Sequence, residues 1–294
     1  MQSNPSDDEL FQLILGLEDQ LEEEGLDPAD RAFHLPNRAM EALGYESFAL
    51  IEGSPTNALF ERVRYIHSML YRPKDVAAGG LHAGAFMFRG IATLIEIPYV
   101  FGSVKIDLLE LCDLTENQKV WLSKREHELS AYCDTAIDLL DFTGGFFRMG
   151  GFKPLPKASI PLFFLARSHL QAAAATLCAT LDTRGCVQSA ILGSELALKA
   201  AISGAGATAK DLKKLGHNQL KLAAAVSSAY PSISATGLTR SVKVLPAYVS
   251  NRYSMTQPSY REAGTIVMAA QYNAGETIRA VCDSSFRRDA SSAS

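Results

Sequence analysis

The feature that most constrains the fold is a series of helical apolar patterns that fills the second half of the chain. Apolar residues recur at helical spacing near residues 158–182, 186–203, 208–228, 239–250 and 260–284, separated by short breaks rich in glycine, serine or proline. Short connections between successive helices favour antiparallel neighbours. The sequence therefore predicts a compact antiparallel helical bundle over residues 158–288, followed by a disordered tail at 289–294.

The first half is also rich in helical patterns. Two capping boxes, Ser6 with Glu9 and Thr115 with Gln118, mark the starts of predicted helices. Helices are expected at 7–24, 28–33, 36–43, 54–73 and 115–141. Within residues 1–142 the sequence therefore predicts an acidic, α-rich N-terminal domain.

A short segment of this domain has a different character. Residues 76–85 are rich in glycine and alanine, which indicates a flexible loop. Residues 86–109 contain many β-branched and aromatic residues, and they predict short strands with a hairpin turn near 98–103. Residues 143–157 hold four glycines and two prolines, which predicts a linker between the two domains. The expected fold class is mainly α, with a small β-hairpin.

Charge divides the two predicted halves. Residues 1–157 carry 14 Lys or Arg against 25 Asp or Glu, whereas residues 158–294 carry 14 against 7. A basic half of this kind can hold phosphates, and it can also attract an acidic protein surface. The acidic N-terminus lacks the apolar core of a signal peptide, and no apolar run approaches the roughly 18 residues that cross a bilayer. We therefore expect a cytoplasmic chain without membrane contact.

No metal or cofactor is expected. The five cysteines are scattered and form no C-x-x-C pair, so they are interpreted as reduced, buried thiols. The glycine pairs at 144–145 and 150–151 lack the surrounding pattern of a phosphate-binding loop. The acidic run of Asp107, Glu110, Asp113 and Glu116 has no histidine beside it, and is interpreted as a solvated face.

Three strings of the second half, in order, carry a family resemblance. Glu195 precedes Leu-Lys-Ala at 198–200, Gly-His-Asn-Gln-Leu spans 216–220, and an Arg-Tyr pair at 252–253 precedes the last helix. In this order they resemble the HEPN (higher eukaryotes and prokaryotes nucleotide-binding) domain over residues 158–284. The resemblance implies a four- or five-helix bundle, often dimeric, of the kind found in toxins, antiphage systems and nucleotidyltransferase partners.

Many HEPN domains are metal-independent RNases, whose signature is an arginine followed after four to six residues by a histidine. Neither histidine of the predicted bundle, His169 or His217, has an arginine at that spacing. The spacing does occur in the first half, at Arg62 and His67. Residues five apart on a helix point in different directions, so we interpret this pair as a solvated arginine and a half-buried histidine.

The resemblance and the local charge together predict a nucleotide- or phosphate-binding surface in the bundle. Its candidate residues are Lys210, Lys213, Lys214, His217, Arg252 and Tyr253. The function expected is nucleotide or RNA binding and homodimerisation, in a bacterial defence or toxin–antitoxin type of system, without an assigned catalytic residue. Two alternatives stay open: a metal-independent endoribonuclease with a non-standard site built from Lys213, His217 and Arg252, and a scaffold that binds a protein partner. For Glu195 and Lys199, four residues apart, a simple ion pair is expected.

Overall fold

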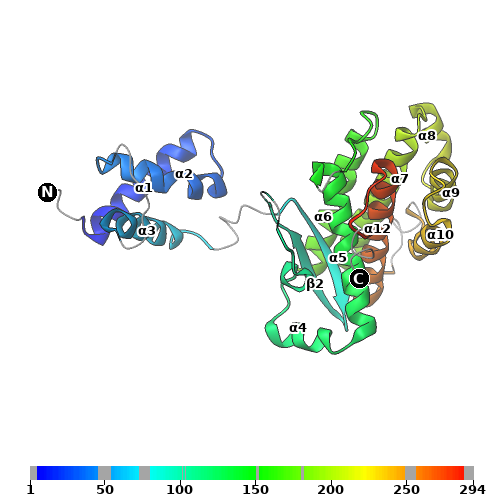
Figure 1. Cartoon of the computed structure of the whole chain (residues 1–294), viewed down its shortest axis with the longest axis horizontal. Coiled ribbons are helices and arrows are strands. Elements are labelled where there is room, and N and C mark those ends of the chain that lie inside the picture. The colour runs from blue at the N-terminus through cyan, green and yellow to red at the C-terminus, as the bar shows by residue number, and fades with distance from the viewer. Residues whose placement is uncertain are drawn as a thin grey trace. The chain divides into compact units, whose positions relative to one another are not determined.

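The computed structural model describes residues 5–45, 54–72, 80–100, 102, 104–149, 152–179, 182–248 and 256–287. It is mainly helical and contains one two-stranded antiparallel sheet, as the sequence predicts (Figure 1). The chain divides into two compact units, residues 1–79 and residues 80–294. None of the helices in the described ranges is long and apolar enough to cross a membrane.

The first unit is a small three-helix core. It consists of α1 (Asp7–Glu23), α2 (Pro28–Ala42) and α3 (Pro55–Ser68). The predicted capping box is present, since Ser6 accepts from the backbone of Glu9 and the Glu9 carboxylate accepts from the backbone of Ser6. The apolar stripes of all three helices meet in one core, which includes Leu10, Ile14, Leu35, Ala39, Val63 and Ile66. In contrast with the prediction of two helices, α2 continues through Pro36.

The second unit begins with the hairpin. Strands β1 (His82–Phe88) and β2 (Ile91–Ile97) pair in antiparallel register, with Ala85 opposite Leu94. The turn lies at Arg89 and Gly90, both of which have positive φ. The predicted turn at 98–103 is therefore wrong, and so is the loop predicted through residue 85. A turn of this kind favours glycine but does not need proline, and the more distant Pro98 was the misleading signal.

Both edges of the hairpin are closed by side chains from outside it. On β1, the backbone N–H of Ala85 donates to Gln271 Oε1 at 2.7 Å, and Gln271 Nε2 donates back to the carbonyl of Ala85 at 2.8 Å. On β2, the N–H of Leu94 donates to Asp113 Oδ1 at 2.9 Å. The N–H and C=O groups of Ala85 and the N–H of Leu94, which a two-stranded sheet leaves unpaired, are thus hydrogen-bonded.

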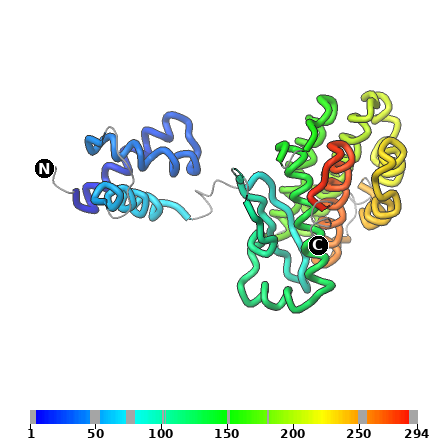
Figure 2. The backbone as a smooth tube through the Cα atoms, in the orientation of Figure 1, coloured from blue at the N-terminus to red at the C-terminus, as the bar shows by residue number. Residues whose placement is uncertain are grey.

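The remaining elements that the structure describes in this unit are helical. They are η1 (Leu108–Leu111), α4 (Glu116–Ser123), α5 (Glu126–Phe147), α6 (Ile160–Cys178), α7 (Thr183–Gly204), α8 (Ala209–Leu215), α9 (Gln219–Ala229), α10 (Ala235–Val244) and α12 (Tyr260–Cys282). Helix α12, orange to red in Figure 2, packs against α5, α6, α7, α10 and β1. It is the central helix of the unit.

Three apolar clusters hold the unit together, and one of them packs η1, α4 and the hairpin against α5. The largest joins α5, α6, α7 and α12 around side chains such as Phe142, Phe163, Leu170, Ile191, Val267 and Ile278. The third attaches α9 and α10 to α7, through Leu198, Ile202, Leu222, Val226, Leu238 and Val242. The α8–α10 region is therefore a layer that lies on the outer side of α7.

The structure corrects the predicted division of the chain. Helix α5 runs through Phe147, so the first part of the expected 143–157 linker is helical, and Thr143, Gly144 and Gly145 are buried. A β-carbon on Gly145 would lie 2.7 Å from the Ile278 side chain. These glycines permit close packing of α5 on its neighbours rather than chain flexibility. The unit boundary lies instead at residues 79 and 80, within the glycine-rich segment. The predicted tail at 289–294 lies outside the described residues.

Candidate nucleotide- or RNA-binding site

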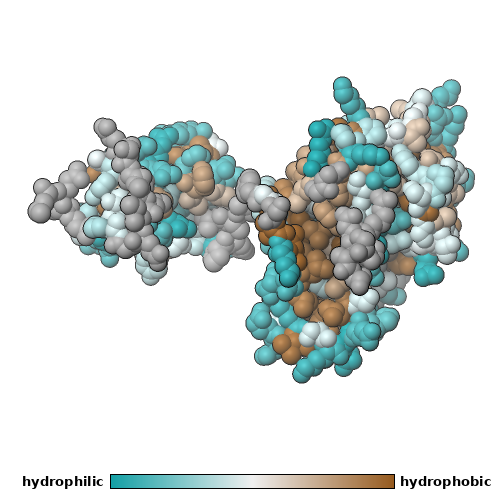
Figure 3. All heavy atoms as spheres, viewed as in Figure 1, coloured by the Kyte–Doolittle hydropathy of each residue, from teal (hydrophilic) through white to brown (hydrophobic). Residues whose placement is uncertain are grey.

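The α8–α10 layer has the strongest excess of positive charge. Residues 204–248 contain six Lys or Arg and one acidic residue, Asp211. The cations are Lys210, Lys213, Lys214, Lys221, Arg240 and Lys243, all of them exposed. We call this layer the basic cap. In Figure 3 its surface, over α8, α9 and α10, is largely pale and teal, whereas deeper brown gathers elsewhere on the unit.

Local backbone geometry places His217 at the joint of α8 and α9. Gly216 ends α8 with a φ of 63°, a conformation that favours glycine. Asn218 then caps α9, because its side chain accepts from the N–H of Lys221 at 3.0 Å. His217 lies between these two signals. The single helix predicted at 208–228 is therefore two helices, and the break presents the imidazole.

The His217 ring is held by a buried carboxylate and an aromatic ring. Its Nδ1 lies 2.9 Å from both carboxylate oxygens of Glu195 on α7. The ring stacks on Tyr248, with centroids 5.7 Å apart and planes at 29°. The His217 side chain is 54% exposed, whereas that of Glu195 is 2% exposed. An imidazole whose Nδ1 is fixed in this way can present Nε2 to a ligand as a donor or as a base.

Glu195 also forms the ion pair expected from the sequence. Lys199 Nζ lies 2.7 Å from Glu195 Oε1, at the i,i+4 spacing. Burying a carboxylate is costly unless it is paired, and here it has two cationic or hydrogen-bonding partners. Glu195 therefore ties α7 to the α8–α9 joint and orients His217.

The three lysines predicted from the sequence share one face of α8. Lys210, Lys213 and Lys214 stand at i, i+3 and i+4, so their side chains are neighbours. Lys214 lies 3.4 Å from Asp211. Within the described residues, Lys210 and Lys213 have no ion-pair partner. The surface beside His217 thus offers unpaired ammonium groups, which suit phosphate oxygens.

Two predicted residues, Arg252 and Tyr253, lie outside the described residues. Sequence reasoning missed four others that belong to the cap: Lys221, Arg240, Lys243 and Tyr248. The local charge count over 204–248 would have found the three cations, because it is much more basic than the half as a whole. No pattern in the sequence marks the stacking of Tyr248 on His217.

Arg62 and His67 both lie on α3 of the first unit, Arg62 partly exposed and His67 buried. Arg62 pairs with the carboxylate of Asp7. His67 is buried, and its Nε2 lies 2.6 Å from Glu18 Oε1. Arg31 and Tyr71 also contact the Glu18 carboxylate. The two side chains thus have separate partners, as a structural interpretation predicts, although His67 is more deeply buried than expected.

The other sequence candidates also have structural partners. Lys119 pairs with Glu110 and Glu116, and Asp113 binds the backbone of Leu94. No group of metal-binding side chains occurs in the part of the chain that the structure describes. The five cysteines are free thiols. Burial raises the pKa of Cys178 to about 12, which keeps this thiol protonated.

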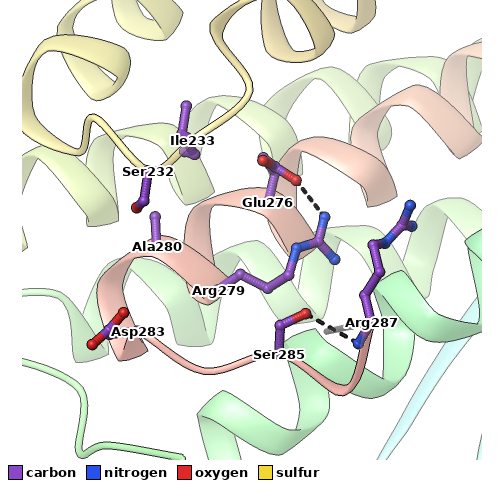
Figure 4. A pocket seen from close by; sticks show the side chains of 8 residues that line it. All are labelled: Ser232, Ile233, Glu276, Arg279, Ala280, Asp283, Ser285 and Arg287. Atoms are coloured by element: carbon purple, nitrogen blue, oxygen red, sulfur yellow. Dashed lines mark hydrogen bonds and ion pairs between the residues drawn. The ribbon is translucent and has the colours of Figure 1, made fainter. Parts of the chain in front are cut away.

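A different pocket, of about 180 Å³, lies beside the end of α12 (Figure 4). Its charged walls include Glu276, Arg279, Asp283 and Arg287. Figure 4 shows Arg279 reaching toward Glu276, and the backbone of Arg287 bonded to the Ser285 hydroxyl. The pocket therefore presents a dense set of polar side chains.

These polar groups are already bound to one another. Arg279 Nη1 bridges Asp138 at 2.8 Å and Asp141 at 2.9 Å, both on α5. Arg287 binds Asp138 at 2.9 Å and Asp134 at 2.8 Å. Asp141 also accepts from the backbone of Phe286 at 2.6 Å. The network fastens the C-terminal segment and α12 to α5, so we assign it a structural role.

Comparison with known protein families, curated proteins and solved structures finds no match to this chain.

Proposed function

We propose that this protein binds a nucleotide or RNA through the basic cap. The observation that carries the proposal is the His217 joint: an exposed imidazole, oriented by buried Glu195 and stacked on Tyr248, beside unpaired Lys210 and Lys213. Lysines provide affinity for phosphates, and an exposed ring edge provides a directional contact. A ligand without negative charge would leave these lysines without a partner.

The family resemblance supports the same class of ligand. It is also the source of two further parts of the proposal, a homodimer and a role in a bacterial defence or toxin–antitoxin type of system. The strings at 195–200 and 216–220, which carry the resemblance, contain the Glu195, Lys199 and His217 side chains that meet in space. Through this contact, Glu195 and Lys199 hold the His217 ring in place.

The test measures RNA affinity of the full chain by fluorescence anisotropy at several salt concentrations. Replacing Lys210, Lys213 and Lys214 by alanine should weaken binding to a labelled single strand. It should also lower the salt slope by about 0.7 for each phosphate that the variant no longer neutralises. The matched control replaces three exposed lysines outside the cap, Lys105, Lys124 and Lys157. Equal weakening in both triple variants would contradict a site on the cap.

The Glu195–His217 contact favours one alternative function, cleavage of RNA without a metal. A carboxylate that fixes Nδ1 leaves Nε2 to take the proton of an attacking 2′-hydroxyl, and nearby lysines can stabilise the charge that develops on the phosphate. His217→Ala should then abolish cleavage in the presence of a chelator while leaving the melting temperature unchanged. Unchanged cleavage would rule out this alternative. If the protein neither binds nor cleaves RNA, the result favours a scaffold for a protein partner.

A further inference from the structure

A pocket of about 510 Å³ opens between the end of α10 and the start of α12, at the edge of the basic cap. The buried side chains of Val187, Leu245 and Ile266 give it an apolar base. Pro246 and Pro258 also line it. Small-molecule sites have this size and combine an apolar base with polar groups that orient the ligand. The polar lining here includes Lys243, Gln257 and the carboxylate of Glu262.

Gln257 supplies such a polar group. Its Oε1 is within 3.4 Å of the Thr183 hydroxyl, and within the described residues its Nε2 has no hydrogen-bond partner. An amide presents both donors and acceptors. It can therefore pair with the edge of a flat heteroaromatic ring that lies on the apolar base.

One cation, Lys243, lines this pocket, and a second cation, Arg240, lies next to it on α10 beyond the pocket lining. Lys243 also lines a second open pocket of about 560 Å³ along α10, together with Arg240, Thr236 and Thr239. Arg240 and Lys243 are three residues apart on one helix, so their side chains are neighbours. Neither has an ion-pair partner among the residues that the structure describes. A phosphate can bind between them, because arginine binds two of its oxygens at once and lysine adds a point charge.

We propose that this pocket binds a nucleoside monophosphate. The base lies on Val187, Leu245 and Ile266 beside Gln257, and the phosphate binds Arg240 and Lys243. Lys243 lines both pockets, so a ligand that lies on the apolar base can also contact this cation. A bare phosphate would leave the apolar base empty, and an uncharged nucleoside would leave both cations unpaired.

This inference deepens the proposed function, since it names a second contact for the same class of ligand. It uses none of the residues of the His217 joint or of the α8 lysine face. The ligand at the α10 pocket can therefore be tested separately from RNA binding at α8 and α9.

The first experiment titrates the full chain, by calorimetry, with the four ribonucleoside monophosphates, the matching nucleosides and inorganic phosphate. At least one monophosphate should bind about tenfold more tightly than both its nucleoside and inorganic phosphate, because it alone engages both the apolar base and the cations. Equal binding of inorganic phosphate would show that the apolar base takes no part, and would overturn the inference. So would the absence of monophosphate binding.

The second experiment compares two double variants. Arg240→Gln with Lys243→Gln should weaken monophosphate binding at least about tenfold, whereas Lys105→Gln with Lys124→Gln, outside the cap, should leave it unchanged. All four side chains are exposed, so melting temperatures should stay close to that of the parent chain. Full affinity in the first variant would overturn the inference. RNA binding without monophosphate binding would overturn this inference alone. Monophosphate binding without RNA binding would contradict only the RNA site at α8 and α9.

Discussion

At the scale of single residues, His82 is a polar side chain that is fully buried at the start of β1. Among the residues that the structure describes, neither of its ring nitrogens has a hydrogen-bond partner. Its ring lies 5.1 Å from that of Phe142. Burial lowers the pKa of His82 to about 3, and the charge of Arg167 contributes to this in the same direction. The imidazole is therefore neutral in the folded protein at neutral pH.

We predict that His82 makes the second unit less stable as the pH falls. Its pKa is near 6.5 in the unfolded chain and about 3 in the folded one, so between these values the unfolded state binds the extra proton. The contribution of His82 to stability is complete above pH 6.5 and decreases as the pH falls toward 3, by on the order of a few kcal/mol in total. Urea unfolding at a series of pH values from neutral down to about 4 measures this slope.

His82→Leu should remove this part of the pH dependence, while the matched change at exposed His127 should leave it in place. The two variants must be compared with each other, because Asp138 changes the stability with pH in the direction opposite to His82. Burial raises the pKa of Asp138 to about 6, against Arg279 and Arg287, so its contribution to stability decreases as the pH rises from 3.8 through 6. An unchanged slope in His82→Leu would show that His82 is not buried in its neutral form.

The sequence predicted some residue contacts and could not predict others. The Glu195–Lys199 ion pair follows from i,i+4 spacing on one helix, and the structure confirms it. His217, however, lies 22 residues from Glu195, and its contact depends on how the α8–α9 joint packs against α7. Local spacing carries no information about that distance, so the centre of the candidate site required the fold.

At the scale of elements, close approach of α12 to α5 depends on glycine. A β-carbon at Gly275 would lie 2.8 Å from the backbone oxygen of Asp138 and 3.1 Å from its Cα. Backbone atoms cannot rotate away as a side chain end can. Gly275 is therefore fixed by packing, although it lies in the interior of a long helix, where glycine is otherwise unfavourable.

Gly275→Ala should destabilise the second unit by about 1–3 kcal/mol, because the added methyl forces α5 and α12 apart. Gly16 is the matched control, since it is also within a helix but has no atom within 4 Å of an added β-carbon. Gly16→Ala should stabilise the first unit by about 0.5–1 kcal/mol through helix propensity alone. Chemical unfolding of both variants measures the difference, and a stabilised Gly275→Ala would contradict this packing.

Helix positions were predictable because apolar periodicity and capping residues are local signals, as Ser6 and Thr115 illustrate. The breaks between helices were less predictable from the sequence. The sequence predicts one helix over 115–141, but the chain breaks at Lys124 and Arg125, and α5 then continues to Phe147. In the sequence, Gly144 and Gly145 suggested that this helix ends before them. In the structure they are buried, and the close packing that they allow stabilises the helix as far as Phe147.

At the scale of the whole molecule, the charge distribution suggested a domain boundary near residue 157, whereas packing divides the chain at residues 79 and 80. The acidic balance of residues 1–157 includes α5, whose Asp138 and Asp141 are neutralised by Arg279 of α12. Opposite charges on α5 and α12 therefore belong to one unit. Residues 1–79, with 15 acidic residues against 6 basic ones, form the separate acidic unit.

Fragments test this division directly. Residues 80–294 should fold with a cooperative unfolding transition, because all helices that contact α12 are present. Residues 158–294 should not, since they lack α5 and the hairpin. Arg279 would then be without Asp138 and Asp141, Gln271 would be without the β1 backbone, and part of the main apolar core would be exposed. Circular dichroism during thermal unfolding measures cooperativity, with residues 1–79 as a third fragment that should fold alone. Cooperative unfolding of 158–294 would restore the boundary suggested by charge.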